Sequence, residues 1–235
     1  MKTGIKELDE IMKIKDNDLI VIAARPTMGK TRLAIRILIN ILKETEKSVL
    51  LFNLDESKEK CKKRIVDVCL DYKVKIEEDY DTFVICDEKT ESNELIVDNK
   101  QEITISEIES RIEKINKKRK LGLIVMDYLQ LIRYDKQSDN RKLEIKQIGK
   151  KLKRISEKIN VPIIVSSQIS RKPDLRDNHR PVIEDFEESA SIVDLSDKIV
   201  LIYRESYYDK KIHDKYITEL IVSKNKAGKT RKMWN

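Results

Sequence analysis

The stretch ARPTMGKT, residues 24–31, ends in the Gly-Lys-Thr that closes a phosphate-binding loop. Its first position is Ala24, where the general pattern G-x-x-x-x-G-K-S/T has a glycine. The stretch stands between the apolar run DLIVIAA at 18–24 and the helix-forming run RLAIRILINIL. A phosphate loop requires this context, because backbone N–H groups at a helix N-terminus bind phosphate oxygens. A chance Gly-Lys-Thr at the start of a helix is the alternative.

In a phosphate loop, Lys30 pairs with the β and γ oxygens of the nucleotide and Thr31 holds Mg²⁺. The candidate nucleotide-binding residues are therefore Ala24, Arg25, Pro26, Thr27, Met28, Gly29, Lys30 and Thr31.

Further apolar, β-branched runs recur along the chain with helical patterns between them. These runs are SVLLFNL at 48–54, ELIVD at 94–98, LGLIVMDYLQLI at 121–132, VPIIVSS at 161–167, DKIVLIY at 197–203 and YITELIVSK at 216–224. Continuous apolar runs are typical of strands that are covered on both faces. The alternation predicts an α/β fold with a mostly parallel, twisted sheet flanked by helices. The last two runs lie close together and predict a C-terminal β-hairpin.

Two intervening segments have clear helix signals. Ser106 followed by Glu109 predicts a capping box at the start of one helix. One apolar stripe predicts a second helix of about 18 residues that stops before Pro162. The stripe consists of Ile145, Ile148, Leu152, Ile155 and Ile159. Segments 73–93 and 133–141 lack apolar periodicity and are predicted to be loops.

Composition limits the class of protein. The 235 residues, 40% of them hydrophobic, suffice for one large domain spanning 1–235. Lys and Arg number 49 against 42 Asp and Glu, a modest excess that permits an anionic partner without naming one. Cys61, Cys69 and Cys86 lack the spacing of a disulfide framework or a zinc site. The N-terminus lacks an apolar signal and no run is long enough to span a membrane, so we expect a cytoplasmic protein.

Three more strand ends carry polar residues suited to nucleotide chemistry. LIVMD at 123–127 ends in Asp127, which would lie beside Lys30 and order the Mg²⁺ shell. LFNLDES supplies Asp55 and Glu56, either of which could orient or deprotonate water, and IIVSSQ supplies Gln168. Each also has an ordinary structural interpretation as a turn residue, a helix cap or a polar strand end.

Together these segments resemble successive motifs of one family, the C-terminal motor domain of DnaB-type replicative DNA helicases. The resemblance rests on ARPTMGKT, LIVMDYLQLI, VPIIVSSQISR and RPVIEDFEESASIVDLSDKIVLIYRESYY. It is collinear over nearly the whole chain, from TGIKELDEI to SKNKAG. It implies a RecA-like P-loop NTPase fold in which a small residue at Ala24 is normal, with ATP and Mg²⁺ as cofactors.

The resemblance also implies a role for each matching residue. Lys30 and Thr31 serve phosphate and Mg²⁺, Asp127 is the Walker B carboxylate, and Gln168 senses the γ-phosphate. Asp55 matches the catalytic glutamate, with the adjacent Glu56 as a substitute. Lys224 and Lys226 match two basic residues that enter the neighbouring subunit's ATP site. A basic C-terminal tail is the ordinary interpretation of these two lysines.

The sequence departs from the family at several positions. Asp55 is one methylene shorter than the family's glutamate, and Lys226 replaces an arginine finger and its planar fork. Glu187 and Ala190 replace an arginine and a glycine of the DNA-facing loop, so that contact cannot simply be transferred. The candidate DNA-binding residues are Arg133, Arg141, Arg171, Arg180 and Glu188, with Lys172 and Arg176 in the same stretch. A solvated charge run explains the basic residues equally well.

The resulting hypothesis is an ATP-dependent motor that hydrolyses ATP at subunit interfaces and translocates on single-stranded DNA as a hexameric ring. Its expected partners are single-stranded DNA, further copies of the chain, and a helicase loader or replication proteins. We expect no membrane partner. We expect the family's N-terminal domain, its linker helix and its last strand after the hairpin to be absent. The alternative is a diverged paralogue that binds ATP or DNA, or regulates a helicase ring, with little turnover. The segments DYLQLI and RPVIEDFEESASI argue against a recombination or clock-type ATPase.

Overall fold

The computed structural model describes residues 1–72, 74, 76–79, 82–85, 94–136, 139–209, 211–212 and 217–234. Cys86 lies outside these residues. The strands described there are β1 (Leu19–Ala24), β2 (Ser48–Asn53), β3 (Ile76–Asp79), β4 (Thr82–Ile85), β5 (Glu94–Asp98), β6 (Leu121–Asp127), β7 (Ile163–Gln168), β8 (Lys198–Tyr203), β9 (Glu219–Asn225) and β10 (Arg231–Trp234). They form one sheet in the order β10-β9-β8-β1-β7-β6-β2-β5-β4-β3.

The centre of the sheet is parallel, as predicted. Strands β8, β1, β7, β6, β2 and β5 pair in parallel, whereas the pairs β8–β9, β9–β10, β4–β5 and β3–β4 are antiparallel. Ala24 pairs with Gln168 at the ends of β1 and β7, and Asn53 pairs with Asp127 at the ends of β2 and β6. Four strands therefore end at one edge of the sheet, where the predicted site residues follow them.

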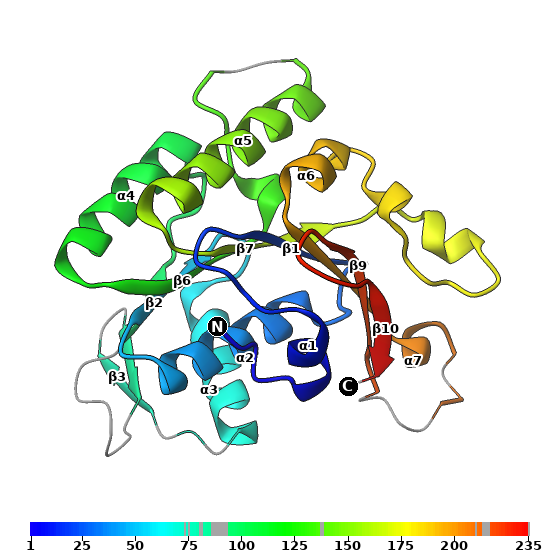
Figure 1. Cartoon of the computed structure of the whole chain (residues 1–235), viewed down its shortest axis with the longest axis horizontal. Helices are drawn as coiled ribbons and strands as arrows, with labels where there is room; N and C mark the ends of the chain where they lie inside the picture. The colour runs from blue at the N-terminus through cyan, green and yellow to red at the C-terminus, as the bar shows by residue number, and fades with distance from the viewer. Residues whose placement is uncertain are drawn as a thin grey trace.

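Helices cover both faces of the sheet (Figure 1). On one side lie α1 (Lys6–Ile11), α2 (Lys30–Glu44) and α3 (Lys58–Asp71), and on the other α4 (Ile105–Lys118), α5 (Arg141–Ile159) and α6 (Ala190–Leu195). The remaining helical segments are α7 (Glu205–Tyr208) and the 3-10 turns η1 (Leu129–Leu131), η2 (Lys172–Leu175) and η3 (Ile183–Asp185).

The strand β1 shows why the sequence produces this layering. Ile20 and Ile22 pack into the core on the α2 side, while Leu19, Val21 and Ala23 pack into the core on the α4–α5 side. Successive strand side chains point to opposite faces, so a continuous apolar run serves two cores at once. The predicted helix stripe is confirmed in α5, whose stripe residues Ile145, Ile148 and Leu152 are fully buried.

The predicted capping box of α4 was placed two residues too late. The capping box joins Thr104 and Glu107, because the Glu107 amide donates to Thr104 Oγ1 at 3.3 Å and the Thr104 amide donates to Glu107 Oε2 at 3.0 Å. Ser106 lies inside the helix, and its hydroxyl donates to Asp135 Oδ2 at 2.6 Å. The Ser106 hydroxyl, which the local pattern predicts to cap the helix, therefore bonds to a residue distant in sequence instead.

Two further predictions were wrong. Segment 73–93 is not simply a loop, because it contains the hairpin β3–β4, which pairs with β5 and buries Phe83. A strand does follow β9, since β10 pairs with it in antiparallel register. Both corrections concern strands at the two ends of the sheet, where backbone pairing needs no long apolar run. Segment 133–141 is shorter than predicted as a loop, because α5 begins at Arg141.

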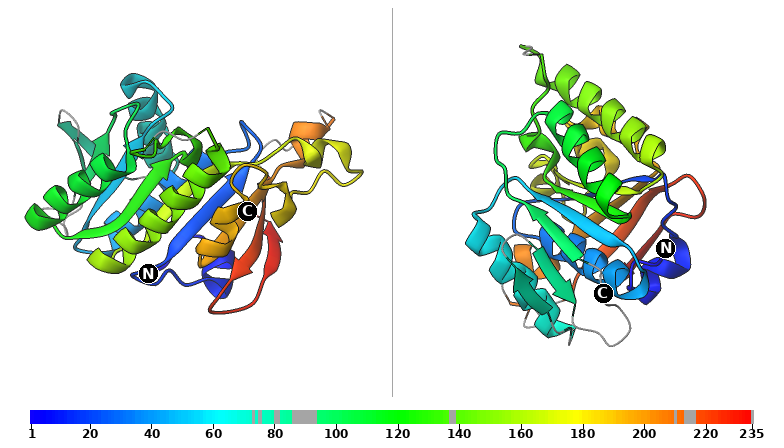
Figure 2. Two further views of the ribbon diagram at one scale, coloured as in Figure 1. Left: turned by 90° about the horizontal axis from the view of Figure 1, so that it is seen from above. Right: turned by 90° about the vertical axis from the view of Figure 1, so that its left-hand side faces the viewer.

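The start of the chain lies beside the hairpin formed by β9 and β10 (Figure 2). Asn225 Nδ2 donates to the Ile11 carbonyl at 3.0 Å, which ties β9 to α1.

Among the helices in the described part of the chain, none combines the length and apolar character that crossing a bilayer requires.

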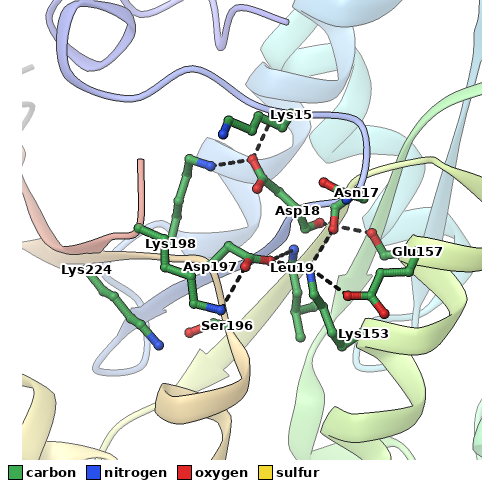
Figure 3. Close-up of polar contacts among 12 residues, drawn as sticks. Lys15, Asn17, Asp18, Leu19, Lys153, Glu157, Ser196, Asp197, Lys198 and Lys224 are labelled. Atoms are coloured by element: carbon green, nitrogen blue, oxygen red, sulfur yellow. Dashed lines mark hydrogen bonds and ion pairs between the residues drawn. The ribbon is translucent and has the colours of Figure 1, made fainter. Parts of the chain in front are cut away.

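A buried ion pair joins the beginning of β1 to the beginning of β8 (Figure 3). The Lys198 ammonium, in a residue only 1% exposed, contacts the carboxylate of the buried Asp18.

Removing one partner of this ion pair leaves an uncompensated buried charge, so we expect Lys198→Ala to lower the free energy of unfolding by about 3–5 kcal/mol. Denaturant titration measures this loss. Replacing Asp18 by alanine as well should recover part of it, and a double variant less stable than both single variants would contradict the account.

Candidate active site

The loop between β1 and α2 is shaped to surround a phosphate. Gly29 caps α2 with φ of 98° and Thr27 has φ of 63°, so both adopt left-handed backbone conformations. A glycine suits φ near 98°, which residues with a side chain rarely adopt. The Lys30 ammonium donates to the carbonyls of Ala24 and Arg25, each at 3.3 Å, so the loop curls around it.

Lys30 is placed to bind an anion. It is 7% exposed, and burial lowers the pKa of its ammonium, while the nearby carboxylates of Asp127 and Asp55 oppose that shift. A buried cation beside backbone N–H groups at a helix start matches the charge of a nucleotide's phosphates.

Asp127 is held rigidly at the end of β6. Thr31 Oγ1 donates to one of its carboxylate oxygens and Ser166 Oγ donates to the other, both at 2.5 Å. The hydroxyl of Thr31 and the carboxylate thus meet as an oxygen donor set. Mg²⁺ in phosphate sites uses one or two carboxylates, with substrate oxygens and water completing its shell, so these residues fit Mg²⁺. The peptide bond that follows Asp127 is cis.

Of the two acidic residues after β2, Asp55 is the one left beside the loop. Glu56 Oε2 accepts a hydrogen bond from Arg64 Nε at 2.9 Å, and the two side chains form an ion pair. Partial burial raises the pKa of Asp55, with Asp127 and Glu56 adding to the shift. Asp55 is therefore close enough to interact with Asp127 and Lys30, as a group acting on water near the γ-phosphate must be.

The segment after Asp127 adds two residues that sequence reasoning missed. Gln130 Nε2 donates to the Gln168 carbonyl at 3.0 Å, and the Gln168 amide donates to Gln130 Oε1 at 3.3 Å. The Gln168 side chain lies close enough to Tyr128 to act against the rise in the pKa of its hydroxyl. Burial, followed by the charges of Asp55 and Asp127, raises the pKa of Tyr128. The run DYLQLI was recognised as a motif, but only the pairing of β6 with β7 shows which partners its side chains meet.

A pocket of about 390 Å³ opens beside the start of α2. Met28, Gly29 and Arg32 line it together with Arg36 and Tyr72, whose side chains stack with the guanidinium carbon 4.7 Å from the ring centre. Among the loop residues, Arg25 is turned toward η2, where its guanidinium pairs with Asp174 at 3.0 Å. The loop is thus flanked by a pocket on one side and tied to a distant segment on the other.

The structure does not bring Lys224 and Lys226 to this loop. Lys226 follows β9, and its amide donates to the Asp197 carbonyl at 3.0 Å, while the Asp197 amide donates to the Leu19 carbonyl at 2.8 Å. Both lysines therefore lie at the beginning of β1, and the loop follows its end at Ala24. Five residue steps of a strand separate the two edges by roughly 16 Å, which a lysine side chain cannot bridge.

Three of the five candidate DNA-binding residues, Arg133, Arg141 and Arg180, have partners within the chain. Arg133 pairs with Glu102 at 2.9 Å, and Arg141 donates to the Gln130 and Ile132 carbonyls, both at 2.9 Å. Arg180 pairs with Glu219 at 2.8 Å. Arg171 precedes η2, and Glu188 lines a pocket of about 240 Å³ between α5 and the segment before α6. Arg141 and Arg180 thus have structural roles, and DNA binding by the five residues stays a prediction.

Comparisons with known proteins agree with this geometry. Residues 1–234 match the family described as the DnaB-like helicase C terminal domain. The Replicative DNA helicase DnaC of Bacillus subtilis is 34% identical over 96% of this chain and 52% of its own length. The Replicative DNA helicase DnaB of Geobacillus stearothermophilus is 32% identical with the same coverage. The chain therefore spans about half the length of these curated relatives.

Solved structures give the same result for the fold. One solved ATPase domain is 25% identical, with a TM-score of 0.83 over 99% of this chain and 86% of that one. The expectation of a RecA-like ATPase sheet with a C-terminal antiparallel hairpin is confirmed by this likeness and by the strand order. A DnaB-like replicative helicase, 24% identical, has the same fold, with a TM-score of 0.81 over 99% of this chain and 60% of its own. The chain belongs to the family of DnaB-like helicase C-terminal domains, as its motifs indicated.

Proposed function

We propose that the chain, acting as one ATPase domain over residues 1–235, is an ATP-dependent motor that translocates on single-stranded DNA during DNA replication. The observation that carries the proposal is the meeting of Thr31 and Asp127 beside Lys30 and Asp55 at one sheet edge. This arrangement combines a phosphate cation, a metal-binding pair and an acidic group for water. The similar proteins named as replicative helicases support the choice of substrate class.

Each side chain has a role in ATP hydrolysis on this proposal. Lys30 binds the β and γ oxygens, and the loop amides hold the phosphates. Asp55 orients or deprotonates the attacking water, and Gln168 reports the γ-phosphate through its contact with Tyr128. Thr31 and Asp127 hold Mg²⁺, which when bound neutralises charge on the phosphates. The pocket beside Arg36 and Tyr72 receives the nucleoside.

The lysines at the opposite edge imply an assembly of several copies. Because Lys226 lies roughly 16 Å from the phosphate loop of its own chain, it can stabilise charge on a γ-phosphate only in another copy. We therefore propose a homo-oligomeric ring, a hexamer by analogy with the family, in which Lys224 and Lys226 complete the neighbour's site. Single-stranded DNA passing through this ring, a loader and other replication proteins are its proposed partners.

The alternative, a regulatory paralogue with little turnover, is not favoured, because the curated relatives are named as replicative helicases. One reason for this alternative is that Asp55 has a shorter side chain than the family's glutamate. Asp55 nevertheless lies close enough to Lys30 and Asp127 to interact with both.

Unwinding of a forked DNA duplex tests the proposal. With ATP and Mg²⁺ the purified chain should separate the strands, and omission of ATP or the change Lys30→Ala should abolish the separation. The assay is run at protein concentrations that saturate a labelled single strand, so that weak ring assembly does not limit it. No strand separation above the Lys30→Ala level at DNA saturation would contradict the proposal.

A further inference from the structure

Lys224 and Lys226 both lie at the sheet edge opposite the phosphate loop. Figure 3 shows Lys224 near Asp197 and Lys153. The Lys224 ammonium donates to the carbonyls of Val193 and Asp194, at the end of α6, the latter at 3.2 Å. The Lys226 ammonium contacts Asp197 Oδ1 at 2.9 Å. Burial and then the charge of Lys226 lower the pKa of Lys224, so the two ammonium groups are close enough to repel one another.

Asp197 is fixed independently of these lysines. Its residue is 8% exposed, and its Oδ2 accepts hydrogen bonds from the Leu19 amide at 2.9 Å and from Lys153 at 2.7 Å. Burial works against a charged carboxylate here, but the bonds from Lys153, Leu19 and Lys226 outweigh it and hold the pKa of Asp197 below its usual value. The carboxylate is therefore charged and held by several donors.

Asp197 anchors Lys226 at both ends. The backbone amide of Lys226 bonds to the Asp197 carbonyl at 3.0 Å, and its ammonium bonds to the Asp197 carboxylate. The Lys226 side chain is nevertheless 51% exposed, so the anchored ammonium faces solvent. An ammonium has three N–H groups, and a single carboxylate oxygen uses one, which leaves donors for a phosphate oxygen.

This arrangement reduces the entropy that Lys226 loses when it meets a ligand. A free lysine side chain samples many rotamers, and ordering it on binding opposes association. Asp197 orders the side chain beforehand. Its negative charge is shared between Lys153 and Lys226, while Lys224 is held by carbonyl dipoles.

We infer that Asp197 is the positioning residue of Lys226, which it aligns beside Lys224 for the terminal phosphates of a nucleotide bound by a second copy of the chain. The inference rests on the proposed function, because it needs ATP at the interface between copies.

Mixtures of two complementary variants test it. One chain carries Lys30→Ala and keeps the lysine pair; we call it the lysine chain. The other carries Lys224→Ala and Lys226→Ala and keeps its phosphate loop; we call it the loop chain. Each alone should hydrolyse ATP at background, and the mixture should recover activity at interfaces where a lysine chain faces a loop chain.

Adding Asp197→Asn to the lysine chain should lower the recovered kcat about tenfold and leave KM for ATP within about twofold. The same change in the loop chain should leave the rate within about twofold, since that chain presents no lysine pair. Glu157→Gln in the lysine chain is the matched control. It removes the same charge near Lys153, which Glu157 contacts at 3.5 Å, and the rate should not change.

The outcomes separate the inference from the proposed function. If the mixture of the lysine chain and the loop chain recovers no ATP hydrolysis, the proposed ATP site shared between two copies is wrong. Recovered activity that does not change when the lysine chain carries Asp197→Asn would overturn the role of Asp197. So would an equal loss of activity when Asp197→Asn is placed in the loop chain, or when Glu157→Gln is placed in the lysine chain. If Asp197→Asn does not fold, as judged by circular dichroism, Lys153→Met in the lysine chain replaces it, with an expected loss of about threefold. An unchanged rate with that variant would equally overturn the inference.

Discussion

Lys30→Ala is expected to weaken ATP binding by at least about 100-fold and to reduce ATP hydrolysis to background. The buried ammonium is the cation around which the loop carbonyls of Ala24 and Arg25 close, and its removal leaves the phosphates without their charged partner. Titration with a fluorescent ATP analogue in the presence of Mg²⁺ measures the affinity.

The matched control for this change is Lys43→Ala, which removes an exposed lysine from the other end of the same helix. It should leave the affinity unchanged. Thermal unfolding of both variants checks that the fold persists. If Lys30→Ala binds the analogue within a few-fold of the parent chain, the loop is not the phosphate site.

Asp55→Asn is expected to lower kcat by about 100-fold or more, with little change in KM for ATP, because an amide cannot accept the proton of the attacking water. Glu56→Gln should lower kcat far less, since the Glu56 carboxylate is already paired with Arg64. Steady-state kinetics of the two variants side by side makes the distinction. A larger loss from Glu56→Gln than from Asp55→Asn would reverse the assignment.

The pH dependence provides a second check on Asp55. Burial raises the pKa of this carboxyl above its ordinary value of 3.8. A general base acts when deprotonated, so kcat should fall as pH decreases through this raised pKa. The acidic limb of the profile should disappear in Asp55→Asn, and a limb that persists in that variant would assign it to another group.

The parallel core was predictable because a strand that is buried on both faces needs apolar side chains at successive positions, which appear in the sequence as an unbroken apolar run. The runs that became β1 and β6 show this, since every residue of both strands is buried and only Asp127, at the end of β6, is polar. The hairpin β3–β4 could not be found in this way, because its strands sit at the end of the sheet. The capping box was ambiguous for a different reason: Thr104–Glu107 and Ser106–Glu109 match the same pattern, and the distant Asp135 decides between them.

The site was predictable where its residues follow strands and not where they meet across strands. Lys30, Thr31 and Asp127 came from motifs at strand ends, and the structure brings them together. The hydrogen bond from Ser166 to Asp127, and the closeness of Gln168 to Tyr128, depend on the pairing of β6 with β7. Glu56 pairs with Arg64 only eight residues further along the chain, yet no local sequence pattern predicts this pairing.

Steady-state ATP hydrolysis, with and without single-stranded DNA, tests most directly whether this chain is a DNA-driven ATPase motor. The account predicts turnover above the Lys30→Ala level that rises when single-stranded DNA is added and depends on Lys224 and Lys226. Turnover that stays at the Lys30→Ala level under both conditions would contradict it.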